Sequence, residues 1–152
     1  MTADPATRGA AEGDPPFERS VLPNGFRIVT QEMPHARSVS VALFVGVGSR
    51  HEDDRHAGLS HLLEHLVFKG TGGYPDPGAL SEAVEGCGGS VNASTDREIT
   101  AYTSRVPAGT AATALAVTAG LTESSRCTRM FSGAAPYSRT EATFGTTTLE
   151  LG

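Results

Sequence analysis

Apolar and polar side chains alternate with a period of two in several stretches of the chain. Residues 26–30 alternate after a Pro-Asn-Gly turn, and residues 39–47 carry a large apolar side chain at every second position. Strand side chains point alternately to the two faces of a sheet, so this spacing predicts two strands. Residues 90–95 and 99–105 flank a short Thr-Asp turn and predict a β-hairpin.

Other stretches have the period of a helix. Leucines and Val67 recur every three or four positions in residues 58–69, which predicts a helix that ends before Gly70. Residues 76–86 predict a second helix, with Asp76 as the N-cap, Pro77 at the first helical position and Gly86 at the end. The Ala-rich residues 107–121 predict a third. Strands and helices in this order predict an α+β fold with an antiparallel-rich sheet and helices on one face.

Both ends of the chain lack these patterns. Residues 1–20 are rich in Ala, Pro, Gly and Asp, and residues 121–152 are rich in Ser, Thr, Gly and Arg. We therefore expect a disordered leader at 1–20, a folded domain at 21–120 and a disordered tail at 121–152.

Composition excludes several classes of function. The net charge of −5 comes without a basic stripe, which argues against a nucleic-acid partner. No apolar stretch is long enough to span a bilayer and no export signal is present, so neither a membrane partner nor secretion is expected. Cys87 and Cys127 do not have the spacing of a metal site, and a reducing, cytoplasmic location is the simpler interpretation.

The chemistry of the chain is concentrated in the predicted helix at 58–69. His61 and His65 are four positions apart, so a helix places their imidazoles one turn apart on one face. Two such imidazoles can bind one Zn²⁺, and Glu64 can accept a proton from a zinc-bound water as a general base. The alternative is a chance pair of histidines on an ordinary helix surface. The order His-x-x-Glu-His in an apolar helix favours the metal site.

Four motifs resemble one family of enzymes. Residues 22–25, 45–50, 58–71 and 88–95 occur in the order and spacing of the pitrilysin-like zinc metallopeptidases (M16, the inverzincins), particularly the processing-peptidase type. The resemblance covers about residues 21–106, the N-terminal part of such enzymes. It implies His61 and His65 as zinc ligands and Glu64 as the general base. It also implies that Asn92 and Ala93 lie on a strand that binds an extended peptide by adding it to the sheet edge.

The third zinc ligand of this family is a glutamate on a later helix. Glu141 stands at the corresponding spacing, but the sequence around it predicts no helix and no apolar face. Family character ends abruptly near Leu121, so a frameshift or a truncated copy is one hypothesis, and a short protein with a disordered tail is the other. Glu141 is accordingly a tentative ligand.

Three interpretations of function follow. The first is a zinc-dependent endopeptidase that hydrolyses extended peptides or unfolded proteins. The second is a non-catalytic module of the same fold, which binds peptide strands or pairs with a homologous subunit. The third is a fragment too small to fold alone, because a sheet that is cut within a domain leaves exposed edges. Zinc binding separates the first from the second, because two histidines alone hold the metal weakly.

Overall fold

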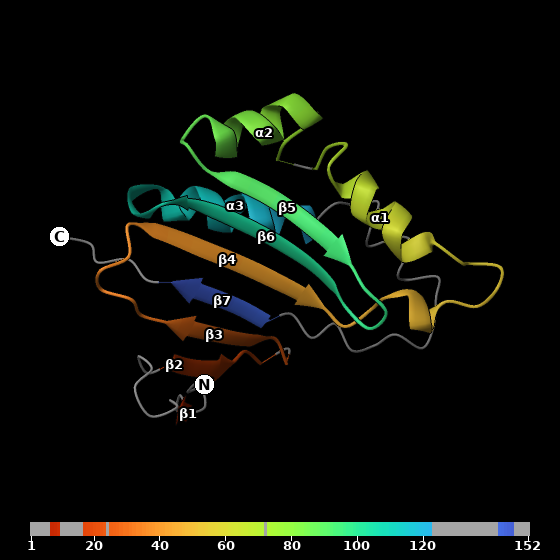
Figure 1. Ribbon diagram of the computed structural model, residues 1–152, viewed down its shortest axis with the longest axis horizontal. Helices are drawn as coiled ribbons and strands as arrows, with labels where there is room; N and C mark the ends of the chain where they lie inside the picture. The colour runs from red at the N-terminus through yellow and green to blue at the C-terminus, as the bar shows by residue number, and fades with distance from the viewer. Residues whose placement is uncertain (1–6, 10–16, 24, 72, 123–142, 148–152) are drawn as a thin grey trace.

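The computed structural model describes residues 7–9, 17–23, 25–71, 73–122 and 143–147. These residues form one seven-stranded sheet and three α-helices (Figure 1). The predicted α+β class with an antiparallel-rich sheet is confirmed.

Neighbouring strands of the sheet are antiparallel, with one exception. The order is β1-β2-β3-β7-β4-β6-β5, and only β3 and β7 run parallel. The strands are β1 (Thr7–Gly9), β2 (Phe17–Val21), β3 (Arg27–Gln31), β4 (Ser38–Val45), β5 (Ser90–Thr95), β6 (Thr100–Pro107) and β7 (Thr143–Thr147). Strand β5 therefore lies at one edge, and its free side faces away from β6.

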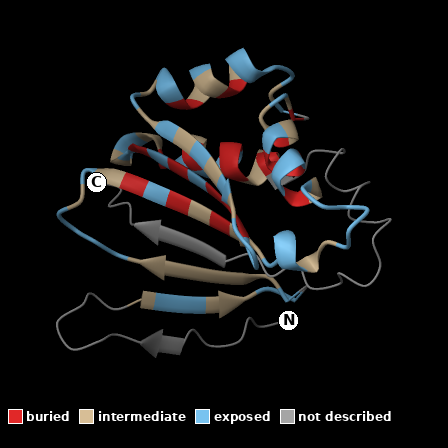
Figure 2. Cartoon of the chain, turned by 45° about the vertical axis from the view of Figure 1, so that its right-hand side comes forward, coloured by how far each residue is buried: buried red, intermediate tan, exposed pale blue. Residues whose placement is uncertain are grey.

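The core lies between the sheet and the helices. Val39, Val41 and Leu43 of β4 are almost completely buried, as the period of two predicts. Helix α3 (Ala111–Thr122) packs against β4 and β6 and begins as a short 3₁₀ turn, η2 (Ala108–Thr110). Figure 2 shows buried positions gathered on β4, β6 and the helices.

Helices α1 (Leu59–Val67) and α2 (Pro77–Glu85) lie over β5. Both were predicted within two residues at each end. The N-cap of α2 is Asp76, whose carboxylate accepts a hydrogen bond from the Ala79 N–H at 2.9 Å, and its C-cap is Gly86. Within the described part of the chain, no helix is long and apolar enough to cross a membrane.

Both ends of the chain contain strands that the local patterns did not predict. Strand β1 and all of β2 except Val21 lie within residues 1–20, and β7 lies within residues 121–152. Strand β2 lacks a period of two because Glu18 and Arg19 are both exposed, and it forms by pairing with β3. Residues 143–147 are rich in threonine, which favours strands, but they show no alternation, and β7 pairs with β3 and β4. Such long-range pairing is not visible in a local pattern.

Candidate functional site

Helix α1 carries the predicted metal motif, and a distant carboxylate fixes its beginning. Gly58 is the N-cap and provides no side-chain hydrogen bond of its own. Instead, the Glu52 carboxylate accepts from the Gly58 N–H at 2.6 Å and from the Ser60 N–H at 2.7 Å. Glu52 thus satisfies helix N–H groups that have no partner within the helix, and its negative charge lies at the positive end of the helix dipole.

The hydrogen bonds at this helix end also change the acidity of Glu52. Partial burial acts to raise the pKa of its carboxyl group. Hydrogen bonds from the side chain and backbone of Ser60, the Gly58 N–H bond and the nearby His56 act in the opposite direction. The net result is that the pKa of Glu52 is lowered from its ordinary value. The carboxylate form that caps α1 is therefore stabilised by the fold.

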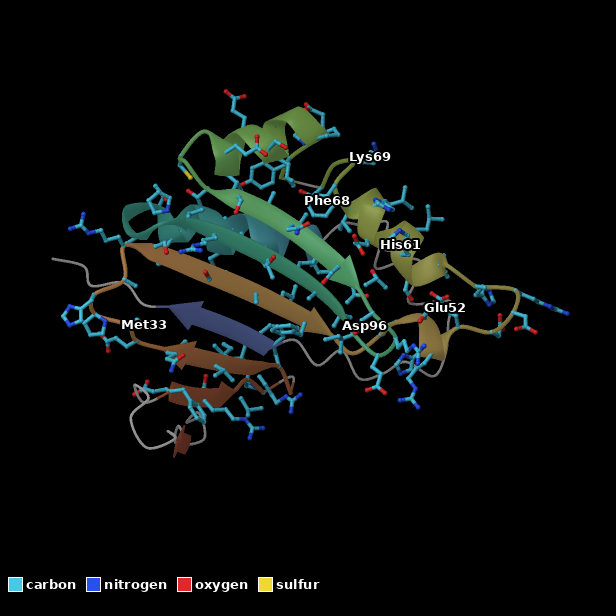
Figure 3. All side chains as sticks on the ribbon, viewed as in Figure 1. Met33, Glu52, His61, Phe68, Lys69 and Asp96 are labelled. Atoms are coloured by element: carbon cyan, nitrogen blue, oxygen red, sulfur yellow. The ribbon has the colours of Figure 1, made fainter. Side chains whose placement is uncertain are left out.

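The segment before Glu52 is attached to the turn between β5 and β6. In η1 (Ser49–His51), the Ser49 N–H donates to the Asp96 carbonyl at 3.1 Å and the Arg50 N–H to the Arg97 carbonyl at 2.9 Å. Gly48 approaches this turn so closely that a Cβ would lie 2.2 Å from the Asp96 oxygen. In Figure 3, Glu52, His61 and Asp96 lie around the same end of β5.

The two histidines of α1 converge. The Nε2 atoms of His61 and His65 are 3.0 Å apart, and the imidazole rings meet edge to face at 88°. Two nitrogen ligands at 2.0–2.1 Å from one tetrahedral zinc would be separated by about 3.3 Å. The observed spacing is close to this value, and both side chains are exposed to solvent. The histidine pair therefore fits a shared Zn²⁺ ion.

Glu64 is the buried member of the motif, with only 8% of its surface exposed. Its Oε2 atom accepts a hydrogen bond from the Thr95 hydroxyl at 2.5 Å, across the contact between α1 and β5. The same oxygen is 3.7 Å from Nδ1 of His61, which is too long for a hydrogen bond. The carboxylate is therefore held next to the histidine pair by the sheet.

Asn92 and Ala93 lie in the middle of the edge strand β5. Asn92 is exposed, and its Oδ1 atom accepts a hydrogen bond from the Ala93 N–H at 2.9 Å. The side chain of Ala93 faces the helices and packs against the core. These positions lie on the strand that leads to Thr95, so the predicted peptide-binding residues and the motif on α1 share one corner of the molecule.

A third metal ligand is not found among the described residues. They contain no group of three or more His, Cys, Asp or Glu side chains that could hold a metal ion. The tentative ligand Glu141 lies outside the described residues, and so does Cys127. Two histidines outside α1 have other partners: His51 accepts a hydrogen bond from the Gly48 N–H, and His56 contacts Asp53.

Sequence reasoning missed two residues of this corner. The sequence patterns gave no role to Glu52, and they placed Thr95 only at the junction of a strand and a turn. Glu52 lies six residues before the N-cap, where the local capping rules do not apply. Thr95 lies at the end of its strand, and the period of two puts its side chain on the same face as Ala93. This alternation was the signal in the sequence that the Thr95 side chain points toward the helices.

Sequence comparison relates the chain to known proteins. Residues 27–130 match the profile of the insulinase family, peptidase family M16. The chain is 44% identical over 88 residues to an uncharacterized zinc protease of Mycobacterium leprae, an alignment of 58% of this chain and 20% of that protein. It is 41% identical over 90 residues to an uncharacterized zinc protease of Bacillus subtilis, with 59% and 22% covered.

A eukaryotic protein matches equally well. The chain is 40% identical over 92 residues to the beta subunit of the mitochondrial-processing peptidase of Dictyostelium discoideum, with 60% of this chain and 19% of that subunit covered. The chain therefore spans about a fifth of the length of these three relatives.

Proposed function

Because the chain belongs to the insulinase family of peptidases, M16, we propose that it carries the catalytic corner of a zinc-dependent endopeptidase. The proposal rests on one observation above the others. The Nε2 atoms of His61 and His65 converge beside the buried carboxylate of Glu64, on a helix that packs against an edge strand. Relatives in this family are zinc proteases by name, which supports zinc as the metal.

In this proposal, His61 and His65 hold the metal through Nε2. Zinc, when bound, supplies a Lewis acid that polarises the scissile carbonyl and lowers the pKa of a water beside it. Glu64 accepts a proton from the attacking water at its carboxylate. It then delivers that proton to the amide nitrogen as the C–N bond breaks, so one group serves as general base and general acid. The burial of Glu64 keeps bulk water away from this proton transfer.

Strand β5 provides a binding site for the substrate. It is an edge strand with one neighbour, β6, so an extended peptide can pair with its free side through main-chain hydrogen bonds. Asn92 and Ala93 lie at the centre of that edge, and the Ala93 N–H now donates to the Asn92 side chain. A peptide carbonyl can replace that side chain as the acceptor. Main-chain pairing of this kind selects extended or unfolded chains rather than one sequence.

A second function is a peptide-binding subunit without hydrolysis. It is favoured by the missing third ligand among the described residues, since a catalytic zinc normally has three protein ligands. The Dictyostelium relative is named as a subunit, which suggests that a homologous chain completes this one. In that case His61 and His65 would bind zinc weakly when the chain is alone.

Zinc content and peptide hydrolysis test the proposal together. The full chain should bind one zinc per molecule, measured by mass spectrometry of metals after gel filtration, and should cleave an unstructured quenched-fluorescence peptide. His61→Ala and His65→Ala should each lose the metal and the hydrolysis, while the exposed His35→Ala should lose neither. If the wild-type chain binds zinc but cleaves no peptide, the binding-subunit function replaces the enzyme. If it retains no zinc after gel filtration, as weak binding by two histidines predicts, and His61→Ala does not weaken zinc affinity in a dye competition either, the metal site itself is wrong.

A further inference from the structure

We propose that Thr95 is a positioning residue, which fixes the catalytic carboxylate of Glu64 and links it to the strand that binds the peptide. The inference rests on the proposed function, because it assigns a role within the same site. It is carried by the geometry of one hydrogen bond, from the Thr95 hydroxyl to Glu64 Oε2 at 2.5 Å. An ionised carboxylate can only accept, so the hydroxyl is the donor and the bond is charge-assisted.

Thr95 is the only hydrogen-bonding partner of the Glu64 side chain among the described residues. His61 Nδ1 lies 3.7 Å from Oε2, which is too far for a hydrogen bond to hold the carboxylate. A glutamate side chain has three rotatable bonds, and one fixed oxygen removes much of that freedom. With Oε2 held by Thr95, the range of positions open to the second oxygen, Oε1, is also reduced.

Strand β5 holds Thr95 itself in place. Thr95 pairs with Thr100 of β6 at the closed end of the hairpin, where the Asp96 N–H donates to the Ile99 carbonyl at 2.9 Å. The Thr100 hydroxyl in turn donates to the Val47 carbonyl at 2.9 Å. Main-chain hydrogen bonds therefore fix the end of the strand that carries the Thr95 hydroxyl. The β-branched side chain of Thr95 has few rotamers, which further restricts the position of the hydroxyl.

The same strand carries Asn92 and Ala93. Thr95 and Ala93 share one face of β5, the face toward the helices, while no other described strand pairs with the free edge of β5. Thr95 therefore sets the distance between the peptide-binding edge and the base on α1. A loss of this contact would leave zinc and peptide binding in place and would misplace the proton acceptor.

Kinetics separate this role from a merely structural one. Thr95→Val keeps the shape of the side chain and removes the donor, so kcat for a quenched-fluorescence peptide should fall about 10- to 100-fold while KM and zinc content stay unchanged. Thr95→Ser restores a hydroxyl and should recover most of the activity. Ser40→Ala removes an exposed hydroxyl from β4, outside the proposed site, and serves as the control. An unchanged kcat in Thr95→Val would overturn the proposal.

A second measurement needs no turnover. In the metal-free chain, Thr95→Val should lower Tm by several degrees when Glu64 is present. In the Glu64→Ala background it should have almost no effect, because the acceptor is gone. Equal losses in both backgrounds would show that Thr95 acts independently of Glu64 and would overturn the inference. If the wild-type chain binds zinc without hydrolysis, the proposed enzyme function fails, and this cycle alone decides whether Thr95 holds Glu64.

Discussion

Helices α1 and α2 have the same length and pack against the same strand, but they are fixed in different ways. Each has nine residues, and each contacts β5. Helix α2 begins with its own cap, since Asp76 accepts from the Ala79 N–H and Pro77 occupies the first position. Helix α1 begins at Gly58 without a local cap, and Glu52 supplies the acceptor from six residues away.

The buried faces of the two helices also differ. In α2 the buried residues are Leu80 and Val84, which are apolar. In α1 they include Glu64, whose carboxylate is hydrogen-bonded to β5. Burial of a carboxylate is unfavourable unless it has a partner, and Thr95 is the partner of Glu64. Helix α2 contributes an apolar face to the core, whereas α1 also carries the residues of the proposed site.

Replacement of one glutamate on each helix gives the largest expected difference. Glu64→Gln removes the proton acceptor with little change in shape, so peptide hydrolysis should fall by about 10²- to 10⁴-fold while zinc remains bound. Glu82→Gln is the matched change on α2, where the side chain is exposed, and should leave the rate unchanged. Initial rates and zinc content of the purified chains check both. Equal rates in the wild type and Glu64→Gln would exclude Glu64 as the base.

Truncation of buried apolar residues should destabilise the two helices to a similar extent. Leu80→Ala in α2 leaves a cavity under β5 and should lower the free energy of unfolding by about 2–5 kcal/mol, measured by urea titration. Leu63→Ala in α1 should cost a similar amount, because Leu63 is equally buried. Leu62, next to it, is 50% exposed, and its replacement by alanine should stay within about 0.5 kcal/mol. A large loss in Leu62→Ala would contradict the assigned burial.

Removal of the two helix caps should have a smaller effect on stability, but it separates the roles of α1 and α2 more clearly. Asp76→Ala and Glu52→Ala each remove the acceptor at a helix start, and each should cost about 0.5–2 kcal/mol of stability. Only Glu52→Ala should also weaken zinc binding, by up to about tenfold, because His61 lies in the first turn of α1. Competition with a zinc-sensitive dye measures this. Equal zinc affinities in the two variants would mean that the cap of α1 does not position the histidine.

The same difference explains what the sequence could predict. Helix α2 was predicted with its cap because Asp76 and Pro77 are neighbours in sequence, and the alternation in residues 39–47 agrees with the buried face of β4. His61, Glu64 and His65 were predicted to lie together because a helix converts their spacing into one face. Glu52 and Thr95 were missed because they act across 6 and 31 positions of the chain. Strands β2 and β7 were missed because they form by long-range pairing without a local pattern.

The smallest expected effect is the pH dependence of the α1 cap. The folded pKa of Glu52 lies below its ordinary value of 4.5, so the folded state favours the carboxylate, and this contribution to stability is fully present above that value. It should be lost as the pH falls below 4.5 and through the folded pKa. The hydrogen bond with His56 also lowers the pKa of the neighbouring Asp53, so the pH dependence of stability alone does not identify the group. The difference in unfolding free energy between the wild type and Glu52→Gln isolates it. That difference should shrink on acidification. Asp76→Asn is the matched change at the cap of α2, and we expect it to leave zinc affinity unchanged. A difference that stays constant from neutral pH to acid would show that hydrogen-bond geometry, rather than the charge of Glu52, holds the start of α1.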